Sequence, residues 1–176
     1  MIDGERLEIL LPAEEIAARV EALADRLAPR LQDGAVGLCL LIGGLWFTAD
    51  LTRALSARGR HLMFDGLWLS SYGAGRESAG ACDVLAGPQR DLAGRQVLIL
   101  DEVADTGVSL NAATRIARAA GASEVITVVF ARKPPPGPSS TQPDDFAWDA
   151  PGRFLVGYGM DVDGRWRDLP HIAAVD

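Results

Sequence analysis

The chain has 176 residues, a length that suits one domain with a full hydrophobic core and no dependence on disulfides or structural metals. Hydrophobic residues make up 48% of the chain and charged residues 23%, a composition that excludes an intrinsically disordered protein. The 24 acidic and 17 basic side chains give a net charge of −7, which disfavours nucleic acid as a partner. We expect a single domain over residues 1–176.

Signals for export, membrane insertion and zinc binding are missing from the sequence. The charged segment over residues 1–8 lacks the apolar core of a secretory leader, and no apolar stretch approaches the roughly 18 residues that span a bilayer. Cys39 lies in an apolar run, where a buried thiol is the ordinary interpretation, and its spacing from Cys82 is not that of a zinc site. We therefore expect a cytoplasmic protein with no membrane partner.

Helices and strands alternate in the first half of the chain. Apolar residues recur at spacings of three and four from Pro12 to Leu31, which predicts a helix. The apolar run Ala35–Ile42 indicates a strand covered on both faces, and Trp46–Ala57 is predicted to be a second helix after two glycines. His61–Ser71 is predicted as the next strand, with a short strand over Ala81–Leu85 beside it.

The segment Gln96–Arg132 carries the clearest local pattern. It is predicted to contain, in order, a buried strand, a loop, a helix and a second buried strand: Val97–Leu100, Asp101–Gly107, Val108–Ala120 and Val125–Ala131. Such a crossover unit of about 35 residues makes its two strands parallel. Pro134–Asp145, with five prolines, is predicted as a loop without helix or strand, and Phe154–Val156 as a short strand. The pattern as a whole predicts an α/β fold.

Three acidic residues follow the buried strand Val97–Leu100. In open α/β sheets ligands bind beyond the carboxyl ends of the strands, and Asp101, Glu102 and Asp105 lie at that position in the sequence. Acidic side chains repel a bare phosphate, so their place here makes sense if the ligand also presents hydroxyl groups or brings Mg²⁺.

The residues after these acids form a pattern that binds phosphate. Thr106, Gly107 and Ser109 open a helix, where free backbone amides and the helix dipole attract an anion. A phosphate-binding turn beside carboxylates describes a site for ribose 5-phosphate. The alternative is a plain strand, turn and helix in which Asp105 only caps the helix.

The segment Val97–Leu110 resembles the phosphoribosyl pyrophosphate signature of the type I phosphoribosyltransferases: four apolar residues, two acids, two apolar residues, then Asp-Thr-Gly-x-Ser. From about Leu7 to Val175 the chain resembles the hypoxanthine-type purine phosphoribosyltransferases. The resemblance implies their fold, a mostly parallel twisted sheet flanked by helices, with a small hood formed by the N- and C-terminal segments. It also implies a homodimer or homotetramer.

Two further segments resemble the family's pyrophosphate-binding and lid regions. Ile42 and Gly43 stand where the family has its pyrophosphate-binding turn, and Arg167, in Arg-Asp-Leu-Pro, stands where a C-terminal arginine reaches the pyrophosphate. Ser71 and Tyr72 stand at the start of the family's flexible lid. Ordinary turn residues and a surface ion pair of Arg167 are the alternatives.

Four residues stand at the family's base-binding and metal-binding positions. Lys133 matches the lysine that contacts the 6-oxo group of the purine, and Phe154 matches the aromatic residue that stacks on it. Leu155 would contact the base through its backbone, and Asp161 would help to hold a metal ion. Core packing of Phe154 and a merely exposed Lys133 are the alternatives.

The resemblance implies a reaction in which purine N9 displaces pyrophosphate from C1 of the phosphoribosyl group. Asp101 and Glu102 would hold the ribose hydroxyls directly or through the metal, and Asp105 would act as the general base near purine N7. The phosphate would lie on the residues that follow: Thr106, Gly107, Val108 and Ser109. Mg²⁺ would neutralise the leaving pyrophosphate. A lysine facing the base favours hypoxanthine or guanine over adenine, whose exocyclic amine is itself a donor.

The chain departs from the family pattern where positive charge is usual. Relatives often carry a lysine where this chain has Ile42 and a basic residue where it has Asp83, and each lost charge-assisted contact costs about 1.5–3 kcal/mol. The acidic pair is Asp-Glu here, whereas Glu-Asp or Asp-Asp is usual. Arg76, Arg167 or backbone amides near Gly43 are the candidates to compensate. The sequence leaves open whether the bond before Ile42 is cis, as it is at that turn in relatives.

Two other functions are compatible with the same motifs. One is a regulator that binds phosphoribosyl pyrophosphate without catalysis, although the chain has no basic excess for binding nucleic acid. The other is a phosphoribosyltransferase that uses another base, such as xanthine or uracil.

Overall fold

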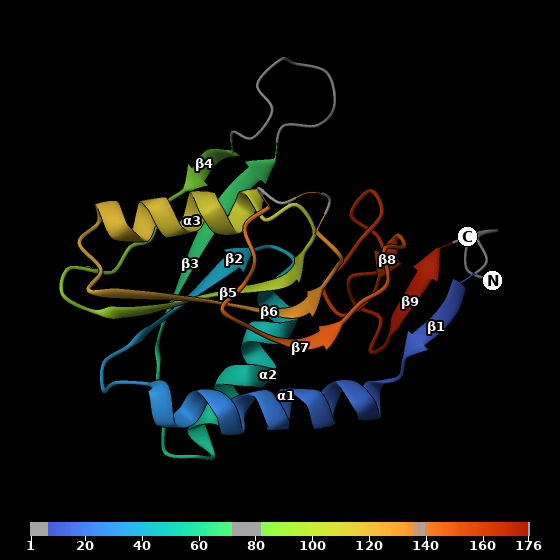
Figure 1. The fold of residues 1–176 in the computed structure, drawn as a ribbon, viewed down its shortest axis with the longest axis horizontal. Coiled ribbons are helices and arrows are strands. Elements are labelled where there is room, and N and C mark those ends of the chain that lie inside the picture. The colour runs from blue at the N-terminus through green and yellow to red at the C-terminus, as the bar shows by residue number, and fades with distance from the viewer. Residues whose placement is uncertain (1–6, 72–81, 136, 138–139, 176) are drawn as a thin grey trace.

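A six-stranded sheet forms the centre of the fold (Figure 1). The computed structural model describes residues 7–71, 82–135, 137 and 140–175. In the order β4-β3-β2-β5-β6-β7, the strands are β4 (Cys82–Ala86), β3 (Met63–Ser71), β2 (Val36–Leu41), β5 (Gln96–Ala104), β6 (Glu124–Arg132) and β7 (Asp145–Asp149). Every neighbouring pair is parallel except β3 with β4. The expected α/β fold with a mostly parallel sheet is confirmed.

Helices cover both faces of this sheet. The helices α1 (Ala13–Leu27) and α2 (Leu45–Ser56) pack on one face, and α3 (Val108–Ala119) packs on the other (Figure 1). Successive residues of a strand point to opposite faces. In β5, accordingly, Leu98 and Leu100 join the core beneath α1 and α2, while Val97 and Ile99 join the core beneath α3. This two-sided burial explains the unbroken apolar runs in the sequence.

The crossover from β5 through α3 to β6 has the predicted parallel strands, but its loop is shorter than predicted. The strand β5 continues to Ala104, and Asp101 pairs in register with Val129 of β6. The loop prediction over Asp101–Gly107 is therefore wrong in its first half. The acidic side chains interrupt the apolar pattern of the sequence, but the backbone keeps its hydrogen bonds to β6, so both acids are held on a strand.

A three-stranded sheet brings the two ends of the chain together. Its order is β1-β9-β8, with β1 (Leu7–Leu11), β9 (Ile172–Val175) and β8 (Leu155–Val156), and the first and last strands of the chain lie side by side in Figure 1. This sheet is the hood expected from the resemblance. The two short strands β1 and β9 carry no local signal strong enough to predict them, because each pairs with a segment from the other end of the chain. Phe154 lies just outside β8.

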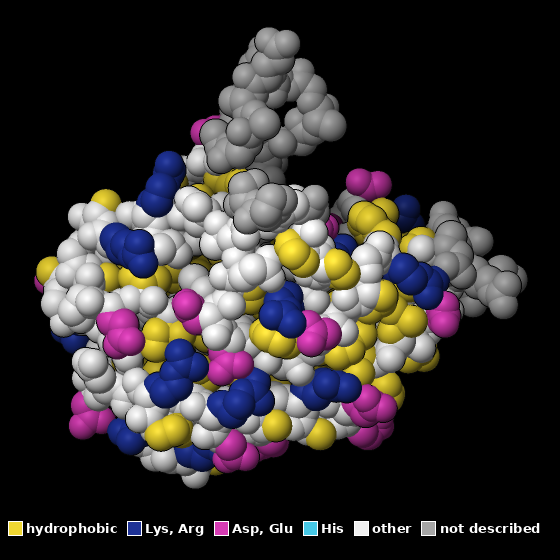
Figure 2. All heavy atoms as spheres, in the orientation of Figure 1, with side chains coloured by type: hydrophobic (Ala, Val, Ile, Leu, Met, Phe, Trp, Pro, Cys, Tyr) yellow, Lys and Arg dark blue, Asp and Glu magenta, His cyan; other side chains and the backbone are white. Residues whose placement is uncertain are grey.

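The last strand of the large sheet, β7, was not predicted. It follows the proline-rich loop directly and pairs with β6, and its central residues are only partly buried, so its sequence lacks an apolar run. Arg26 and Arg30 of the helical region hold its first residue, Asp145, with N–O distances of 2.9 and 3.3 Å. Basic and acidic side chains are accordingly interspersed on the face shown in Figure 2.

The first helix is shorter than the predicted Pro12–Leu31. It begins after Pro12 and changes at Ala28 to a 3₁₀ turn, η1 (Ala28–Arg30), which contains Pro29. A proline lacks the amide hydrogen that would continue the α-helical hydrogen bonds. Among the described residues, no helix combines the length and the apolar character needed to cross a membrane.

Candidate active site

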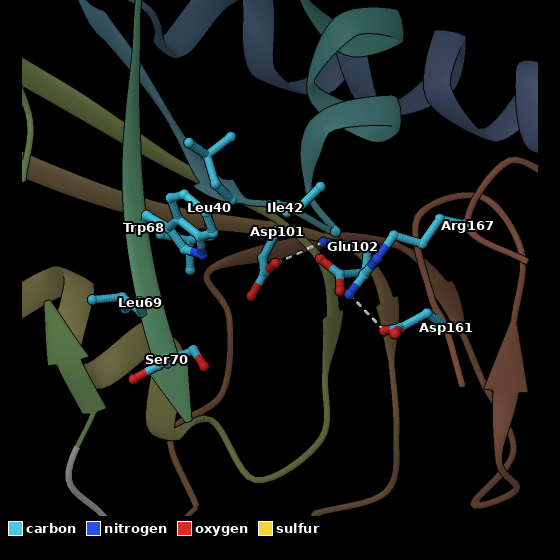
Figure 3. Close-up of a pocket in the computed structure, with 12 residues that line it drawn as sticks. Leu40, Ile42, Trp68, Leu69, Ser70, Asp101, Glu102, Asp161 and Arg167 are labelled. Carbon is cyan, nitrogen blue, oxygen red and sulfur yellow. Dashed lines mark hydrogen bonds and ion pairs between the residues drawn. The ribbon is translucent and has the colours of Figure 1, made fainter. Parts of the chain in front are cut away.

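A cavity of about 390 Å³ lies at the carboxyl ends of β2, β3 and β5 (Figure 3). This is the edge at which open α/β sheets bind ligands. Seven residues predicted for the site line it together: Ile42, Gly43, Asp101, Glu102, Ser109, Asp161 and Arg167. Five lining residues were not predicted, because they belong to strands whose apolar pattern signals only burial: Leu40, Leu41, Trp68, Leu69 and Ser70.

The adjacent acids of β5 form the electrostatic centre of the cavity (Figure 3). Asp101 is buried, and its carboxylate accepts a hydrogen bond of 3.0 Å from the backbone amide of Glu102. Burial, and then the negative charge of Glu102, raise the pKa of Asp101 well above its ordinary value. The pair is therefore suited to a ligand that supplies hydroxyl donors or positive charge.

The Glu102 carboxylate packs directly against the turn between β2 and α2. A methyl group at Gly43 would overlap that carboxylate, so only glycine fits this position without movement. The buried Oε2 atom of Glu102 has no hydrogen-bond partner. A buried carboxylate oxygen without a partner is costly, and a cation or a hydroxyl group of a ligand would satisfy it.

The same turn is also packed against the loop that follows β8. Gly159 has φ of +102° and lies so close to the Gly43 carbonyl that a methyl group at Gly159 would overlap it. The peptide bond between Leu41 and Ile42 is cis. The backbone of the turn is thus in close contact with both Glu102 and Gly159, which also lie next to each other.

Arg167 is the one cation among the described residues that line the cavity. Its guanidinium lies 2.6 Å from an oxygen of Asp161 and donates to the Gly159 carbonyl at 2.5 Å (Figure 3). Asp161 also accepts a hydrogen bond of 2.6 Å from the Gly164 amide. The C-terminal arginine and the expected metal ligand therefore lie together and contact each other.

The turn at Ile42 and Gly43, where the resemblance places pyrophosphate, contributes little positive potential of its own. Ile42 is 45% exposed and carries no charge, and the Gly44 amide already donates to the Leu40 carbonyl at 3.1 Å. Three carboxylates and one guanidinium line the described part of the cavity. A polyanionic ligand would enter this field only with a cation that offsets the acids.

The start of α3 has no side-chain cap from its N-cap residue, and its Val108 amide donates a long hydrogen bond of 3.4 Å to the Thr106 hydroxyl. Gly107 is the N-cap residue in a left-handed conformation (φ +76°), and it has no side chain to cap the first turn. Thr106, Gly107 and Val108 line a neighbouring hollow of about 220 Å³. Thr141, from the proline-rich loop, closes one side of this hollow next to Gly107.

Asp105 and Lys133 lie against each other. The Lys133 ammonium is 3.3 Å from a carboxylate oxygen of Asp105, and the Lys133 amide donates to the Ala104 carbonyl at 2.9 Å. The Lys133 side chain is only 14% exposed, whereas the Asp105 side chain is 59% exposed. The structure therefore brings the expected general base and the expected base-binding lysine to one place.

The remaining predicted residues that the structure describes lie in or next to the hood and at the end of β3. Phe154 is 55% exposed, which rules out the alternative that it is a core residue, and Leu155 is buried. Ser71 ends β3, opposite Cys82 of β4. Tyr72 and Arg76 lie outside the described residues.

The described residues contain no group of three or more acidic, histidine or cysteine side chains arranged to hold a metal ion. Mg²⁺ commonly takes one or two carboxylates and completes its shell with water and substrate oxygens. Asp101 and Glu102, with an unpartnered oxygen on Glu102, fit this mode of binding.

The sequence matches the family model of the phosphoribosyl transferase domain over residues 10–161. The chain belongs to the phosphoribosyltransferase family. Among curated relatives of this phosphoribosyltransferase, the hypoxanthine-guanine phosphoribosyltransferase of Mycobacterium tuberculosis is 31% identical over 180 residues, covering 98% of this chain and 88% of the relative. The enzyme of the same name from Aquifex aeolicus is 30% identical and is covered to 98%.

Solved structures agree with this membership. Hypoxanthine phosphoribosyltransferase from Trypanosoma cruzi, in complex with the product IMP, superposes with a TM-score of 0.88 at 28% identity, covering 100% of this chain and 97% of that one. A hypoxanthine phosphoribosyltransferase from Staphylococcus aureus gives a TM-score of 0.88 at 26% identity, covering 96% of this chain and 91% of that one. The type I phosphoribosyltransferase fold expected from the resemblance is confirmed.

The raised pKa of Asp101 predicts how an Asp101→Asn variant changes stability with pH. Because the pKa of Asp101 is higher in the folded protein than in the unfolded chain, protonation of this carboxyl stabilises the folded state. This stabilisation is fully present at pH values below the pKa of Asp101 in the unfolded chain. It is lost as the pH rises through the pKa of Asp101 in the folded protein. In metal-free buffer the variant, which keeps the acceptor oxygen, should be more stable than the wild type at pH 8, and this difference should vanish towards pH 4. Urea unfolding across this range measures it, and a pH-independent difference would contradict the assignment.

Proposed function

We propose that this phosphoribosyltransferase transfers the 5-phosphoribosyl group from phosphoribosyl pyrophosphate to N9 of a 6-oxopurine, either hypoxanthine or guanine. The products are a nucleoside monophosphate and pyrophosphate, as in purine salvage. The names of the relatives support this choice of base, and the arrangement of Asp105 and Lys133 is the observation that carries it.

The Asp105–Lys133 pair matches one edge of a 6-oxopurine. The O6 and N7 atoms are neighbours on that edge, where O6 is a hydrogen-bond acceptor and N7 can carry a proton. Lys133 would donate to O6, and Asp105, whose carboxylate is 3.3 Å from the ammonium, would accept the proton from N7. Adenine presents a donor in place of O6 and would offer the partly buried ammonium no acceptor on the base.

The remaining residues bind and orient the other substrate. The backbone amides at the start of α3, next to Gly107, would hold the 5-phosphate, with the Val108 amide exchanging its long bond to the Thr106 hydroxyl for the phosphate. Asp101 and Glu102 would hold the ribose hydroxyls, and Arg167 would contact the pyrophosphate from the opposite wall of the cavity. The exposed ring of Phe154 would stack on the base, with the Leu155 backbone beside it.

The acidic lining supports Mg²⁺ as the cofactor. When bound, Mg²⁺ neutralises charge on the leaving pyrophosphate. Asp101 and Glu102 are the residues best placed to hold it, because Asp161 is already engaged by Arg167 and by the Gly164 amide. Asp161 would reach the metal only after exchanging one of these contacts.

Turnover with a panel of bases tests the proposed function. The protein should release pyrophosphate when supplied with phosphoribosyl pyrophosphate, Mg²⁺ and hypoxanthine or guanine, and should release little with adenine, xanthine or uracil. A preference for xanthine or uracil would assign another base. If the protein binds phosphoribosyl pyrophosphate but forms no product with any base, the result would favour a regulator that binds this ligand without catalysis.

The variant Asp105→Asn tests the general base. Asparagine keeps the size of the side chain but cannot accept the proton from N7, so kcat should fall by about 10²–10⁴-fold. Affinity for phosphoribosyl pyrophosphate, measured by calorimetry, should change by less than about two-fold, because the phosphate-binding amides remain. Unchanged turnover would remove Asp105 from this role.

An apolar patch supports self-association of the enzyme. The patch consists of Phe64 and Trp68 of β3 with Leu85 of β4, which are between 42% and 57% exposed. The strand β4 is also an edge of the large sheet, and exposed apolar residues on a sheet edge commonly mark a contact between chains. We propose a homodimer or homotetramer that uses this patch, which places the partner chain next to the cavity lined by Trp68.

The oligomer should depend on Leu85. A charged residue at the centre of an apolar contact is costly, so Leu85→Glu should weaken association by at least about ten-fold. Sedimentation velocity over a range of concentrations measures this change. The matched control is Ile9→Glu, because Ile9 is equally exposed (58%, against 57% for Leu85) but lies on β1 in the hood. If Ile9→Glu dissociates the oligomer and Leu85→Glu does not, the contact between chains lies at the hood and not at the patch.

A further inference from the structure

Tyr158 connects the loop after β8 to helix α2. The side chain is buried, with 5% of the residue exposed, and its hydroxyl donates a hydrogen bond of 2.9 Å to Asp50 of α2. The Asp50 carboxylate also forms an ion pair with Arg53 on the same helix, with an N–O distance of 2.6 Å. The Tyr158 hydroxyl therefore binds a charged acceptor, and such hydrogen bonds are stronger than neutral ones.

Aromatic packing determines where this hydroxyl points. The Tyr158 ring meets Phe130 of β6 edge to face, with centroids 5.0 Å apart, and Phe130 meets Phe47 of α2 in the same way at 5.9 Å. Burial and the charge of Asp50 raise the pKa of Tyr158, so the hydroxyl keeps its proton. The ring is held on both sheet and helix, and the hydroxyl has little freedom to leave Asp50.

The backbone at Tyr158 is held in a conformation that a side chain disfavours. Its φ is +49°, between Gly157 at +90° and Gly159 at +102°. Two backbone hydrogen bonds of 2.9 Å anchor the turn, from the Tyr158 amide to the Leu169 carbonyl and from the Gly159 amide to the Arg167 carbonyl. The contacts of the Tyr158 side chain offset the cost of this conformation and orient the loop as one unit.

The loop held in this way carries one wall of the cavity. Gly159 packs on the Gly43 carbonyl of the pyrophosphate-binding turn, and the Gly159 carbonyl accepts a hydrogen bond from Arg167. The turn leads directly into α2, which begins at Leu45 and carries Asp50 one turn later. The Tyr158–Asp50 hydrogen bond therefore connects the loop that holds Arg167 to α2, the helix that directly follows the turn at Gly43.

We propose that Tyr158 is a positioning residue for the pyrophosphate subsite, which sets the placement of Arg167 relative to the turn at Gly43 through its hydrogen bond to Asp50. This inference rests on the proposed function, because it assigns pyrophosphate to the cavity between them. Tyr158 itself is buried beneath the loop and does not line the cavity.

The variant Tyr158→Phe keeps the ring and removes only the hydroxyl. The KM values for phosphoribosyl pyrophosphate and, in the reverse reaction, for pyrophosphate should rise by about ten-fold, the effect of losing one hydrogen bond to a charged group. The KM for the purine base should change by less than about two-fold, because the base is bound by other residues. Equal changes in all three values would indicate a general structural role and overturn the inference, as would no change.

Variants of Asp50 provide the matched comparison. Asp50→Asn keeps a neutral acceptor for the hydroxyl and should raise the two KM values by less than Tyr158→Phe does, whereas Asp50→Ala should reproduce the effect of Tyr158→Phe. The double variant Tyr158→Phe with Asp50→Ala should be no worse than either single variant, because both remove one interaction. Additive effects would overturn the inference. If Tyr158→Phe does not fold, the two Asp50 variants carry the same test.

Hydrogen exchange gives a readout that does not depend on catalysis. In Tyr158→Phe, the amides of residues 157–169 and of residues 42–45 should both exchange faster, because the two segments are packed on each other. If the wild type shows no turnover, the proposed function fails while this coupled exchange still tests the positioning role. Faster exchange in residues 157–169 alone would show that the turn is not coupled to Tyr158 and would overturn the inference.

Discussion

The site depends on the close packing of three backbone segments around Gly43. The Glu102 carboxylate occupies the space in which a side chain at this position would lie, and Gly159 presses on the Gly43 carbonyl. The end of β5, the turn before α2 and the loop after β8 can approach so closely only because two of them lack a Cβ atom at the contact. The acids, the turn and Arg167 consequently line one cavity (Figure 3).

Electrostatics set the second constraint on this cavity. The desolvated pair Asp101 and Glu102 is favourable only when a ligand supplies hydroxyl groups or positive charge, and Arg167 is partly neutralised by Asp161. The uncharged Ile42 at the turn adds nothing to offset the acids. The proposed function therefore includes a divalent cation that admits pyrophosphate. In that proposal the placement of Arg167, the one arginine among the described residues that line the cavity, matters correspondingly more.

The fold was predictable where burial is two-sided and contacts are local. The strands β2, β5 and β6 have continuous apolar sequences because helices cover both faces, and the short connection through α3 determines that β5 and β6 are parallel. The strands β1, β7 and β9 were not predictable, because they are short or half-buried and their partners are distant in sequence. The length of β5 was underestimated because the acidic residues Asp101 and Glu102 are typical of a loop in the sequence. Their place in the strand follows only from the pairing of β5 with β6.

The sequence by itself determined which charged groups line the cavity and the order of the site residues within Asp101–Ser109, because a strand, a tight turn and a helix that follow one another fix where successive side chains lie. It did not indicate the residues of β2 and β3 that complete the lining. Only the tertiary structure decided that Lys133 contacts Asp105, that Arg167 contacts Asp161 and that Glu102 rests on Gly43. These contacts join separate strands and loops. Their geometry follows from how sheet, helix and hood pack together, and no local pattern of residues encodes that packing.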